Sequence, residues 1–511
     1  MHDVGGSAVI TSSLQPLRPA EFDFNAARRL LSRAGFAGTP AQVRALQTMG
    51  LDDAVDYLLE FGEVEYEPVE ADRFDRTIMS PLSDMERIQL RRARQQGDEA
   101  FVERYRLERH RRQRADRQQM RSIQQWWLAR MIETPRPLEE RMTLFFHGHF
   151  ATGYRAIEDS YHMFQQNQLF RRHAVGNFKE LTHRIIRDPA MLEYLNNNQN
   201  RRQSPNENLA RELMELFTLG EGNAYTEDDI KEAARALTGY TFQDDAFVGL
   251  DSQTFRRMHD TGVKRILGRS GRFNGDDLVD LIFSKRTVSE HICLKLYRYF
   301  VHDLPNGPDE SRKAFIVRLA REFRDARYEL KPVLRTLFRS EHFYDPSNVG
   351  AQIKSPAQLT VQAIRSLRTP TRDLQLLLSG LEMMGQTLFQ PPSVEGWEGG
   401  RSWINTSTLF VRQNVLVYLL TGHKPETPLG ARDGETYDAS HLVEHLAAEG
   451  TTSDPTEAAT YLLRFCLATE PLPKRVEAIR SFIDDCGGRL TNDVVVGALS
   501  LITAMPEYQL C

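Results

Sequence analysis

Helical periodicity recurs along almost the whole chain, whereas the alternation of apolar and polar residues that marks a half-buried strand is rare. Segments such as FNAARRLLSRAGF, DSYHMFQQNQLFRR and PDESRKAFIVRLAREF place apolar residues three and four positions apart, which gathers them on one face of a helix. Only short runs near YTFQDDAFVGL and RRMHDTGVKRILG could form a hairpin. The sequence therefore predicts a mainly α, multi-helical globular assembly with at most a short β-hairpin.

The length and composition of the chain allow a large hydrophobic core. Of its 511 residues, 41% are hydrophobic and 26% are charged, as in ordinary globular proteins. Changes in composition divide the chain into four parts. They are a loose N-terminus (1–22), a helical domain (23–420), a linker (421–440) and a C-terminal helical block (441–511).

An Arg-rich helical insertion lies within the large domain, at about residues 85–125. Between Arg87 and Arg121 there are twelve arginines and five acids, an excess of seven positive charges. Such an excess could bind phosphate or nucleic acid. The interspersed Gln and Glu and the scarcity of aromatic residues favour instead a solvated helix, or a helical hairpin around Gly97. Docking of an acidic protein partner is a further alternative.

The global charge and the cysteines exclude several classes of protein. The net charge of -5 gives no basis for binding nucleic acid or an anionic membrane. The four cysteines form no C-x-x-C pair, so neither a disulfide framework nor a thiolate zinc site is indicated. The chain shows no signal peptide and no run of about eighteen apolar residues. We therefore expect a cytoplasmic protein with no membrane span and no nucleic-acid partner.

The segment FFHGHF carries His147 and His149 two residues apart. In an extended segment this spacing aims both imidazoles to one side, as a metal site requires, whereas on a continuous helix they point about 200° apart. Because Gly148 lies between them, we expect the preceding helix to end there. The alternative is a pair of capped or core histidines.

The segment SPNENLARELMELFTLGEG reads as one short helix with three glutamates. Ser204, Pro205 and Glu207 fit the N-cap, N1 and N3 positions of a capping box, in which the glutamate reaches back to the N-cap amide. Gly220 fits the residue that closes a helix at its C-terminus. Glu207 therefore has a predicted structural role.

The other two glutamates of this helix differ in their neighbours. Glu207, Arg211 and Glu215 are spaced as a salt-bridge ladder. Glu212 lies at the border of the apolar stripe and has no basic residue four positions before it or three or four after it. An unpaired carboxylate at the edge of a core is costly unless a metal, a histidine or a substrate meets it. The predicted buried stripe consists of Leu209, Leu213, Leu216 and Phe217.

The segment MHDTGVK offers His259 beside Asp260 and Lys264. A histidine with a nearby carboxylate could act as a general base or as a metal ligand with its orienting group. Adjacent side chains seldom face each other, so a surface turn is the competing interpretation.

Two further groups are candidate binding residues. Arg171, Arg172 and His173 form a cationic group suited to an anionic ligand, or a solvated helix face. Trp397 and Trp403 stand among glycines and could form a stacking platform for a ring, or could pin a loop to the core. The chain contains no Walker loop, G-x-S-x-G elbow, H-E-x-x-H motif or dinucleotide fingerprint.

Taken together, these segments resemble the bacterial family known as domain of unknown function 1800 (DUF1800). The family often has Trp, Asn, Trp and Pro where this chain has Phe146, Gly148, Tyr240 and Glu398. The matching segments are RRLLSRAGFAGTP, LEERMTLFFHGHFAT, RRHAVGNFKELTHRIIRDPAMLEYLNN, NENLARELMELFTLGEGNAYTEDDIKEAARALTGY, HDTGVKRILG, IKSPAQL and PPSVEGWEGGRSWINTS.

The resemblance implies little about activity, because the family is named for its lack of an assigned function. Members are often encoded beside a second family of sulfatase-like, frequently exported proteins (DUF1501-type). The resemblance therefore implies a sulfatase-like protein as a partner, and export together with that partner is compatible with the missing signal peptide.

The leading hypothesis from the sequence is a metal-dependent enzyme, hydrolytic or oxidative. His147, His149 and Glu212 would hold a divalent metal such as Zn, Fe or Mn, because imidazole and carboxylate ligands suit these ions. Glu212 would also be catalytic, together with Glu215, His259 and Asp260. The alternative is a non-catalytic helical scaffold that binds the sulfatase-like partner through residues 87–121 or the tryptophan loop.

Overall fold

The structure is a computed structural model, and it describes residues 11–66, 74–222, 224–424, 436–448 and 454–511. Helices account for nearly all of its regular structure, which confirms the predicted mainly α fold. The predicted loose N-terminus (1–22) and linker (421–440) lie partly outside the described residues. None of the described helices is both long and apolar enough to cross a membrane.

The N-terminal helices form a small unit that packs against later parts of the chain. Asp23 caps the first of them by accepting a hydrogen bond from the amide of Ala26, and Thr39 forms a capping box with Gln42 at the second. The three helices are α1 (Phe24–Ala34), α2 (Pro40–Met49) and α3 (Leu51–Leu59).

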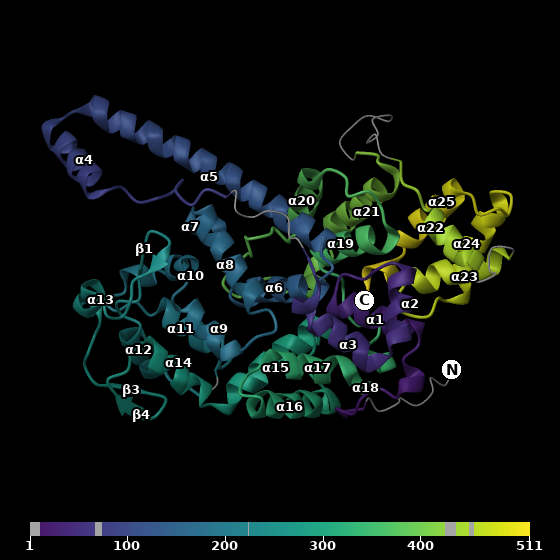
Figure 1. Cartoon of the computed structure of the whole chain (residues 1–511), viewed down its shortest axis with the longest axis horizontal. Coiled ribbons are helices and arrows are strands. Elements are labelled where there is room, and N and C mark those ends of the chain that lie inside the picture. Colours follow the sequence, from purple (N-terminus) through teal and green to yellow (C-terminus); the bar gives the residue numbers. More distant parts are fainter. Residues whose placement is uncertain (1–10, 67–73, 223, 425–435, 449–453) are drawn as a thin grey trace.

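The Arg-rich insertion is a helical hairpin made of α4 (Asp84–Gln96) and α5 (Glu99–Glu133). Gly97 joins the two helices in the left-handed conformation, with φ 71°. The pair projects from the body of the molecule as an arm, and the end of α5 returns into the core (Figure 1). The helical hairpin expected around Gly97 is thus confirmed.

Helix α6 (Pro137–His149) lies at the centre of the molecule and is buried at every residue except Gly148, which is half-buried. A helix covered on all sides carries no polar face, so its charged residues need partners inside the protein. The helices that follow it are α7 (Tyr154–Ile157), α8 (Ser160–Arg172), α9 (Phe178–Ile185), α10 (Pro189–Tyr194), α11 (Asn208–Glu215), α12 (Glu227–Ala236), α13 (Gln253–Met258) and α14 (Gly275–Phe283).

Two separate two-stranded antiparallel sheets form near the two predicted strand-like runs. In the first, β1 (Phe242–Gln243) pairs with β2 (Ala246–Phe247). In the second, β3 (Lys264–Ile266) pairs with β4 (Arg269–Gly271). Each run therefore belongs to its own hairpin.

The second half of the chain is helical throughout its described part. Its helices are α15 (Arg286–Phe300), α16 (Glu310–Asp325), α17 (Leu330–Arg339), α18 (Glu341–Tyr344), α19 (Pro356–Leu367), α20 (Leu374–Met383), α21 (Thr406–Thr421), α22 (Ser440–Ala448), α23 (Pro455–Cys466), α24 (Pro473–Asp485) and α25 (Asn492–Thr503). Within the described ranges, short 3-10 turns occur at Pro19–Glu21, Phe61–Glu63, Asn197–Gln199, Pro346–Asn348, Gly400–Trp403 and Pro506–Gln509.

Two hydrophobic cores meet at α6. One core joins α1 to α3 with α9, α11, α12 and α14 to α17, and it takes Phe145 and Phe146 from α6. The other joins the end of α5 with α19 to α25, and it takes Leu144 from α6. Since the C-terminal helices share a core with α19 to α21, they are packed against the large helical region; the four-part division of the chain stays a prediction.

Candidate functional site

His147 is a core histidine. Helix α6 continues through Gly148 to His149, so the expected helix end at Gly148 is wrong, and the two imidazoles leave a helix in different directions. The Nε2 atom of His147 accepts a hydrogen bond from the Asn167 amide at 3.0 Å. Its ring packs against Trp127 and two phenylalanines, and burial lowers its pKa to about 3. The histidine is therefore neutral and enclosed.

His149 lies on another side of α6, against the end of α11. Its Nε2–H donates a hydrogen bond to the carbonyl of Phe217 at 3.0 Å, which leaves Nδ1 as the atom with the free lone pair. Nδ1 is buried and has no hydrogen-bond partner among the described residues. Burial, followed by the charge of Lys295, holds the pKa of His149 well below its ordinary value. A buried lone pair without a donor is costly, so this atom is a candidate contact for a ligand.

His149 lines a cavity of about 660 Å³, here called the tryptophan-loop cavity. The volume is that of a typical small-molecule site. Its wall comes from α6, α15, the segment 350–358 and the loop 395–403. Its charged and aromatic lining residues are Arg141, Phe145, His149, Lys295, Arg298, Tyr299, His302, Asp303, Glu395, Trp397, Glu398, Arg401 and Trp403.

Helix α15 gives this cavity a cationic wall. Lys295 is half-buried and makes no hydrogen bond or ion pair with any described residue. Burial, and then the charge of Arg298, lowers the pKa of Lys295. His302 accepts a hydrogen bond from the amide of Leu304 at 2.9 Å, and burial lowers its pKa to about 4. Lys295 and the exposed Arg298 are thus the charged groups of this wall.

Both tryptophans of the predicted binding loop line the same cavity. Trp403 is buried and Trp397 is half-buried, with its Nε1–H buried and without an acceptor in the described part of the chain. The loop lies directly on α6, because a Cβ atom added to Gly396 would come within 2.0 Å of the Gly148 carbonyl oxygen. Gly396 also has φ 87°, a conformation that favours glycine. The loop therefore brings Trp397 beside the backbone that carries His149.

The predicted capping box at α11 is wrong, whereas the ion-pair ladder is confirmed. The helix begins at Asn208 and Glu207 makes no capping hydrogen bond. Instead, Arg211 binds Glu207 and Glu215 at 3.3 Å each, and it also reaches Glu227 at 2.8 Å. The helix ends at Glu215, so Gly220 does not close it. The predicted stripe is buried at Leu209, Leu213 and Phe217 and partly buried at Leu216.

Glu212 is the glutamate for which the described structure provides no polar partner. Its side chain is half-buried and forms no hydrogen bond or ion pair with a described residue. Burial, and then the charge of Glu215, raises its pKa. Neither Glu212 nor His147 lines the tryptophan-loop cavity. Across the described residues, no group of three or more His, Cys, Asp or Glu side chains could hold a metal.

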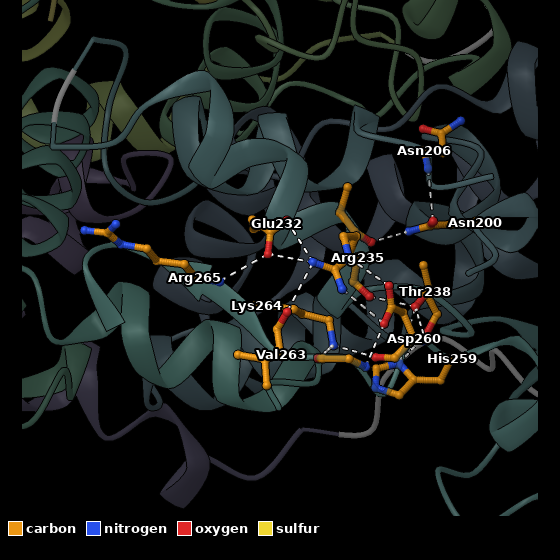
Figure 2. A network of polar contacts seen from close by, with 12 residues as sticks. Asn200, Asn206, Glu232, Arg235, Thr238, His259, Asp260, Val263, Lys264 and Arg265 are labelled. Carbon is orange, nitrogen blue, oxygen red and sulfur yellow. Dashed lines mark hydrogen bonds and ion pairs between the residues drawn. The ribbon is translucent and has the colours of Figure 1, made fainter. Parts of the chain in front are cut away.

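His259 and Asp260 belong to a polar network that ties α12 to the loop before β3 (Figure 2). His259 Nδ1 donates to the Thr238 carbonyl at 2.9 Å, and its ring stacks on Phe255. Asp260 binds Arg235 at 2.7 Å, which is the first cause of its lowered pKa. The histidine and the carboxylate therefore have separate partners. His259 is buried and Asp260 half-buried, so they do not form an exposed surface turn.

Arg171 is committed to an internal partner. Its Nε and Nη2 donate to the two oxygens of Glu140 at 2.7 and 2.9 Å, and the side chain is buried. The predicted cationic group is therefore divided, since Arg172 is exposed and His173 half-buried while Arg171 lies inside. The reason is the carboxylate of Glu140 on α6, which α8 packs against.

Comparison with protein-family models assigns this chain to a family. The model of the family described as "Protein of unknown function (DUF1800)" matches residues 29–510. Because the match covers nearly the whole chain, the protein belongs to this family. A search of curated proteins and a search of solved structures found no significant match.

The cationic wall of the cavity was missed in the sequence. His291, Lys295 and Arg298 follow one another at intervals of four and three residues and share one face of α15, and His302 lies just beyond its end. Of these four residues, Lys295, Arg298 and His302 line the cavity. That face looked like an ordinary solvated surface. A signal was available in ICLKLYRYF, where Lys295 stands between Leu294 and Leu296 in a largely apolar segment.

Proposed function

We propose that this protein binds a small anionic molecule in the tryptophan-loop cavity, with Lys295 and Arg298 as its charge partners. The observation that carries the proposal is Lys295, a half-buried ammonium group in the cavity wall without a hydrogen bond or ion pair to a described residue. A half-buried cation without a partner is unfavourable, and an anionic ligand would remove that cost through a charge-assisted hydrogen bond.

Two further polar groups support the assignment and suggest how the ligand is oriented. The buried Nε1–H of Trp397 can donate to the ligand, and the lone pair on His149 Nδ1 can accept from it. Trp403 offers an apolar ring at the same cavity. Polar groups that converge beside an aromatic ring are typical of small-molecule sites.

The metal-dependent reaction expected from the sequence stays a proposal. Of its three predicted metal ligands, only His149 lines the cavity. The Nε2–H of His149 donates to a backbone carbonyl, as the outer nitrogen of a metal-bound imidazole commonly does. Its Nδ1 is therefore oriented as a ligand would be. His147 and Glu212 lie outside the cavity wall, so an anionic molecule is favoured over a three-residue metal site as its occupant.

Ligand screening with a matched pair of lysine variants tests the proposal. Thermal shift and calorimetry would be run with inorganic phosphate, pyrophosphate, citrate and a sugar phosphate on wild type, Lys295→Met and Lys313→Met. Lys313 is an exposed lysine on α16 and serves as the control. We expect one of these anions to bind wild type and the control equally, and Lys295→Met about tenfold or more weakly. Equal binding by Lys295→Met would remove the support.

The scaffold alternative has one observation in its favour, the projecting arm (Figure 1). Arg104, Arg106 and Arg109 are exposed on α5, where an acidic partner surface could meet them. The test is size-exclusion chromatography with the sulfatase-like protein that the resemblance implies. We expect the triple Arg→Glu variant to lose a complex that wild type forms, and absence of any wild-type complex counts against this function.

A further inference from the structure

A second, much smaller cavity lies between α1 and the C-terminal part of the chain. It has a volume of about 30 Å³ and is here called the arginine cavity. Four cationic side chains line it, and its described lining includes no Asp or Glu. These cations are Arg28, Arg29, Arg33 and Lys354.

Most guanidinium N–H groups of this cluster donate to neutral acceptors, but the buried Nε of Arg28 has no partner among the described residues. Arg29 donates to the carbonyl of Asn348 at 2.9 Å, and Arg33 donates to the carbonyls of Phe300 and Tyr299 at 2.9 and 3.0 Å. Both arginines are at most 8% exposed. Carbonyl oxygens satisfy N–H groups but carry no net charge, so they leave the cost of burying the positive charges largely uncompensated.

Lys354 is the cation of this cavity whose charged group has no hydrogen bond to a described residue. Its side chain is 1% exposed, and its Nζ makes no hydrogen bond with a described residue, lying 4.0 Å from the centre of the Tyr508 ring. Arg412 is fully buried and donates to the Lys354 carbonyl at 2.7 Å. Burial lowers the pKa of Lys354 to about 8, and the charges of Arg28 and Arg412 act in the same direction. An ammonium group in such a place needs an anion.

We propose that the arginine cavity binds one small inorganic anion, of the size of chloride, against the Lys354 ammonium and the surrounding guanidinium groups. The cavity volume of about 30 Å³ exceeds the 10–15 Å³ or so that a single water needs, and is too small for a phosphate or sulfate. The ion joins α1 to the segment before α19 and to the final residues of the chain. It is therefore a structural ion whose concentration sets part of the stability.

Cys511 is the competing source of negative charge. Its Sγ accepts a hydrogen bond from Arg33 Nη1 at 2.5 Å. The sulfur already accepts from Arg33 and, at 3.5 Å, from Gln358, whereas Lys354 lines the cavity and its Nζ has no hydrogen bond to a described residue. A negative charge on Cys511 would act on Arg33 through this hydrogen bond and would raise the pKa of Lys354. It makes no hydrogen bond to the Lys354 ammonium, whereas an external anion in the cavity would.

Thermal unfolding of the full chain in matched salts tests the proposal. Sodium chloride would be titrated against sodium gluconate at constant ionic strength and pH 7, since gluconate is too large for the cavity. We expect chloride to raise the Tm of wild type saturably, by about 2–3 °C near a hundredfold excess over Kd. Lys354→Met should lose this response, and the control Lys313→Met should keep it.

Crystals grown in bromide give a second readout that needs no variant. We expect an anomalous peak beside Lys354 Nζ. Equal Tm values for wild type in chloride and gluconate, as a Cys511 thiolate would give, together with no bromide at Lys354, would overturn the proposal. An equal chloride response in Lys354→Met would overturn it as well, because the ion would then bind elsewhere.

Discussion

Two buried clusters of charge in this protein are composed differently. Around α6, the carboxylate of Glu140 accepts hydrogen bonds from Trp127, Arg130 and Arg171, and Arg130 also binds Glu139 at 2.9 Å. Two cations thus meet two carboxylates. Around the arginine cavity, Arg28, Arg29, Arg33, Lys354 and Arg412 meet carbonyl groups, a thiol and an aromatic ring instead.

The charges around Glu140 stabilise the fold by pairing with each other, whereas the proposal assigns a bound anion to the charges around Lys354. In the Glu140 cluster, burial alone would raise the pKa of that carboxyl, but Arg171 and Arg130 outweigh it and hold the pKa below its ordinary value. In the Lys354 cluster, burial lowers the pKa of the ammonium to about 8. The partners of Glu140 stabilise its charged form, whereas burial opposes the charged form of Lys354.

The largest effect should follow from breaking the paired cluster. We expect Glu140→Gln to lower the free energy of unfolding by about 3–5 kcal/mol, because Arg171 would be left buried without its anion and Arg130 would keep only Glu139. Urea denaturation measures the loss. Glu108→Gln is the control, since Glu108 and Arg111 form an exposed pair 3.7 Å apart on the arm, and it should change stability by less than about 0.5 kcal/mol. Similar values for both variants would erase the distinction.

In the unpaired cluster around Lys354, a rise in pH should increase the free energy of unfolding. The unfolded lysine keeps its proton up to about 10.5, whereas folded Lys354 loses it near 8. The unfolded state therefore binds more protons between these values, and stability rises with pH across this window, by up to about 3 kcal/mol without chloride. The charged or titratable groups near Lys354 are Arg28, Arg412, Cys466, Cys511 and Tyr508.

Denaturation at pH 8, 9 and 10 measures this rise. Lys354→Met should flatten it, and saturating chloride should flatten it in wild type, because a bound anion restores the ordinary pKa of the ammonium. A rise that persists unchanged in Lys354→Met would assign the titration to another group.

The sequence predicted what depends on local spacing. The mainly α fold follows from the 3.6-residue period, and the Arg211 ladder from its i, i+4 intervals. It failed where packing decides. Gly148 does not end α6, because a glycine inside a helix costs only about 1 kcal/mol and here its backbone is covered by Gly396. That contact joins residues 248 positions apart (396 minus 148), and no local pattern reports it.

The candidate site shows the same division. Trp397 and His149 were each singled out by their sequence neighbourhoods, but their shared cavity depends on the loop folding over α6. Lys295 was missed because an isolated lysine on a helix usually lies in solvent. Arg171 was assigned to a ligand because its actual partner, Glu140, is 31 residues away in the sequence, and no local spacing links the two.

Lys295 is an intermediate case between the two clusters. It is a cation without a partner, yet it is only half-buried, so water compensates part of its charge. We expect Lys295→Met to change stability by no more than about 0.5–1 kcal/mol, while weakening anion binding at the tryptophan-loop cavity about tenfold or more. Denaturation and calorimetry on the same preparation separate the two effects. A loss as large as that of Glu140→Gln would place Lys295 among the structural charges.

Glu212 is the negative counterpart of Lys295, and the smallest effect should be found there. Burial raises its pKa, so the folded state holds a proton that the unfolded state releases, and the carboxylate costs stability once the pH exceeds the folded pKa. Glu212→Gln removes that cost. We expect stability at pH 7 to be unchanged or slightly higher, within about 0.5 kcal/mol. A metal ligand would behave in the opposite way, since its loss removes the metal together with the stability the metal supplies. Elemental analysis of wild type and Glu212→Gln, alongside denaturation, therefore decides whether this carboxylate is an unpaired edge group or part of a metal site.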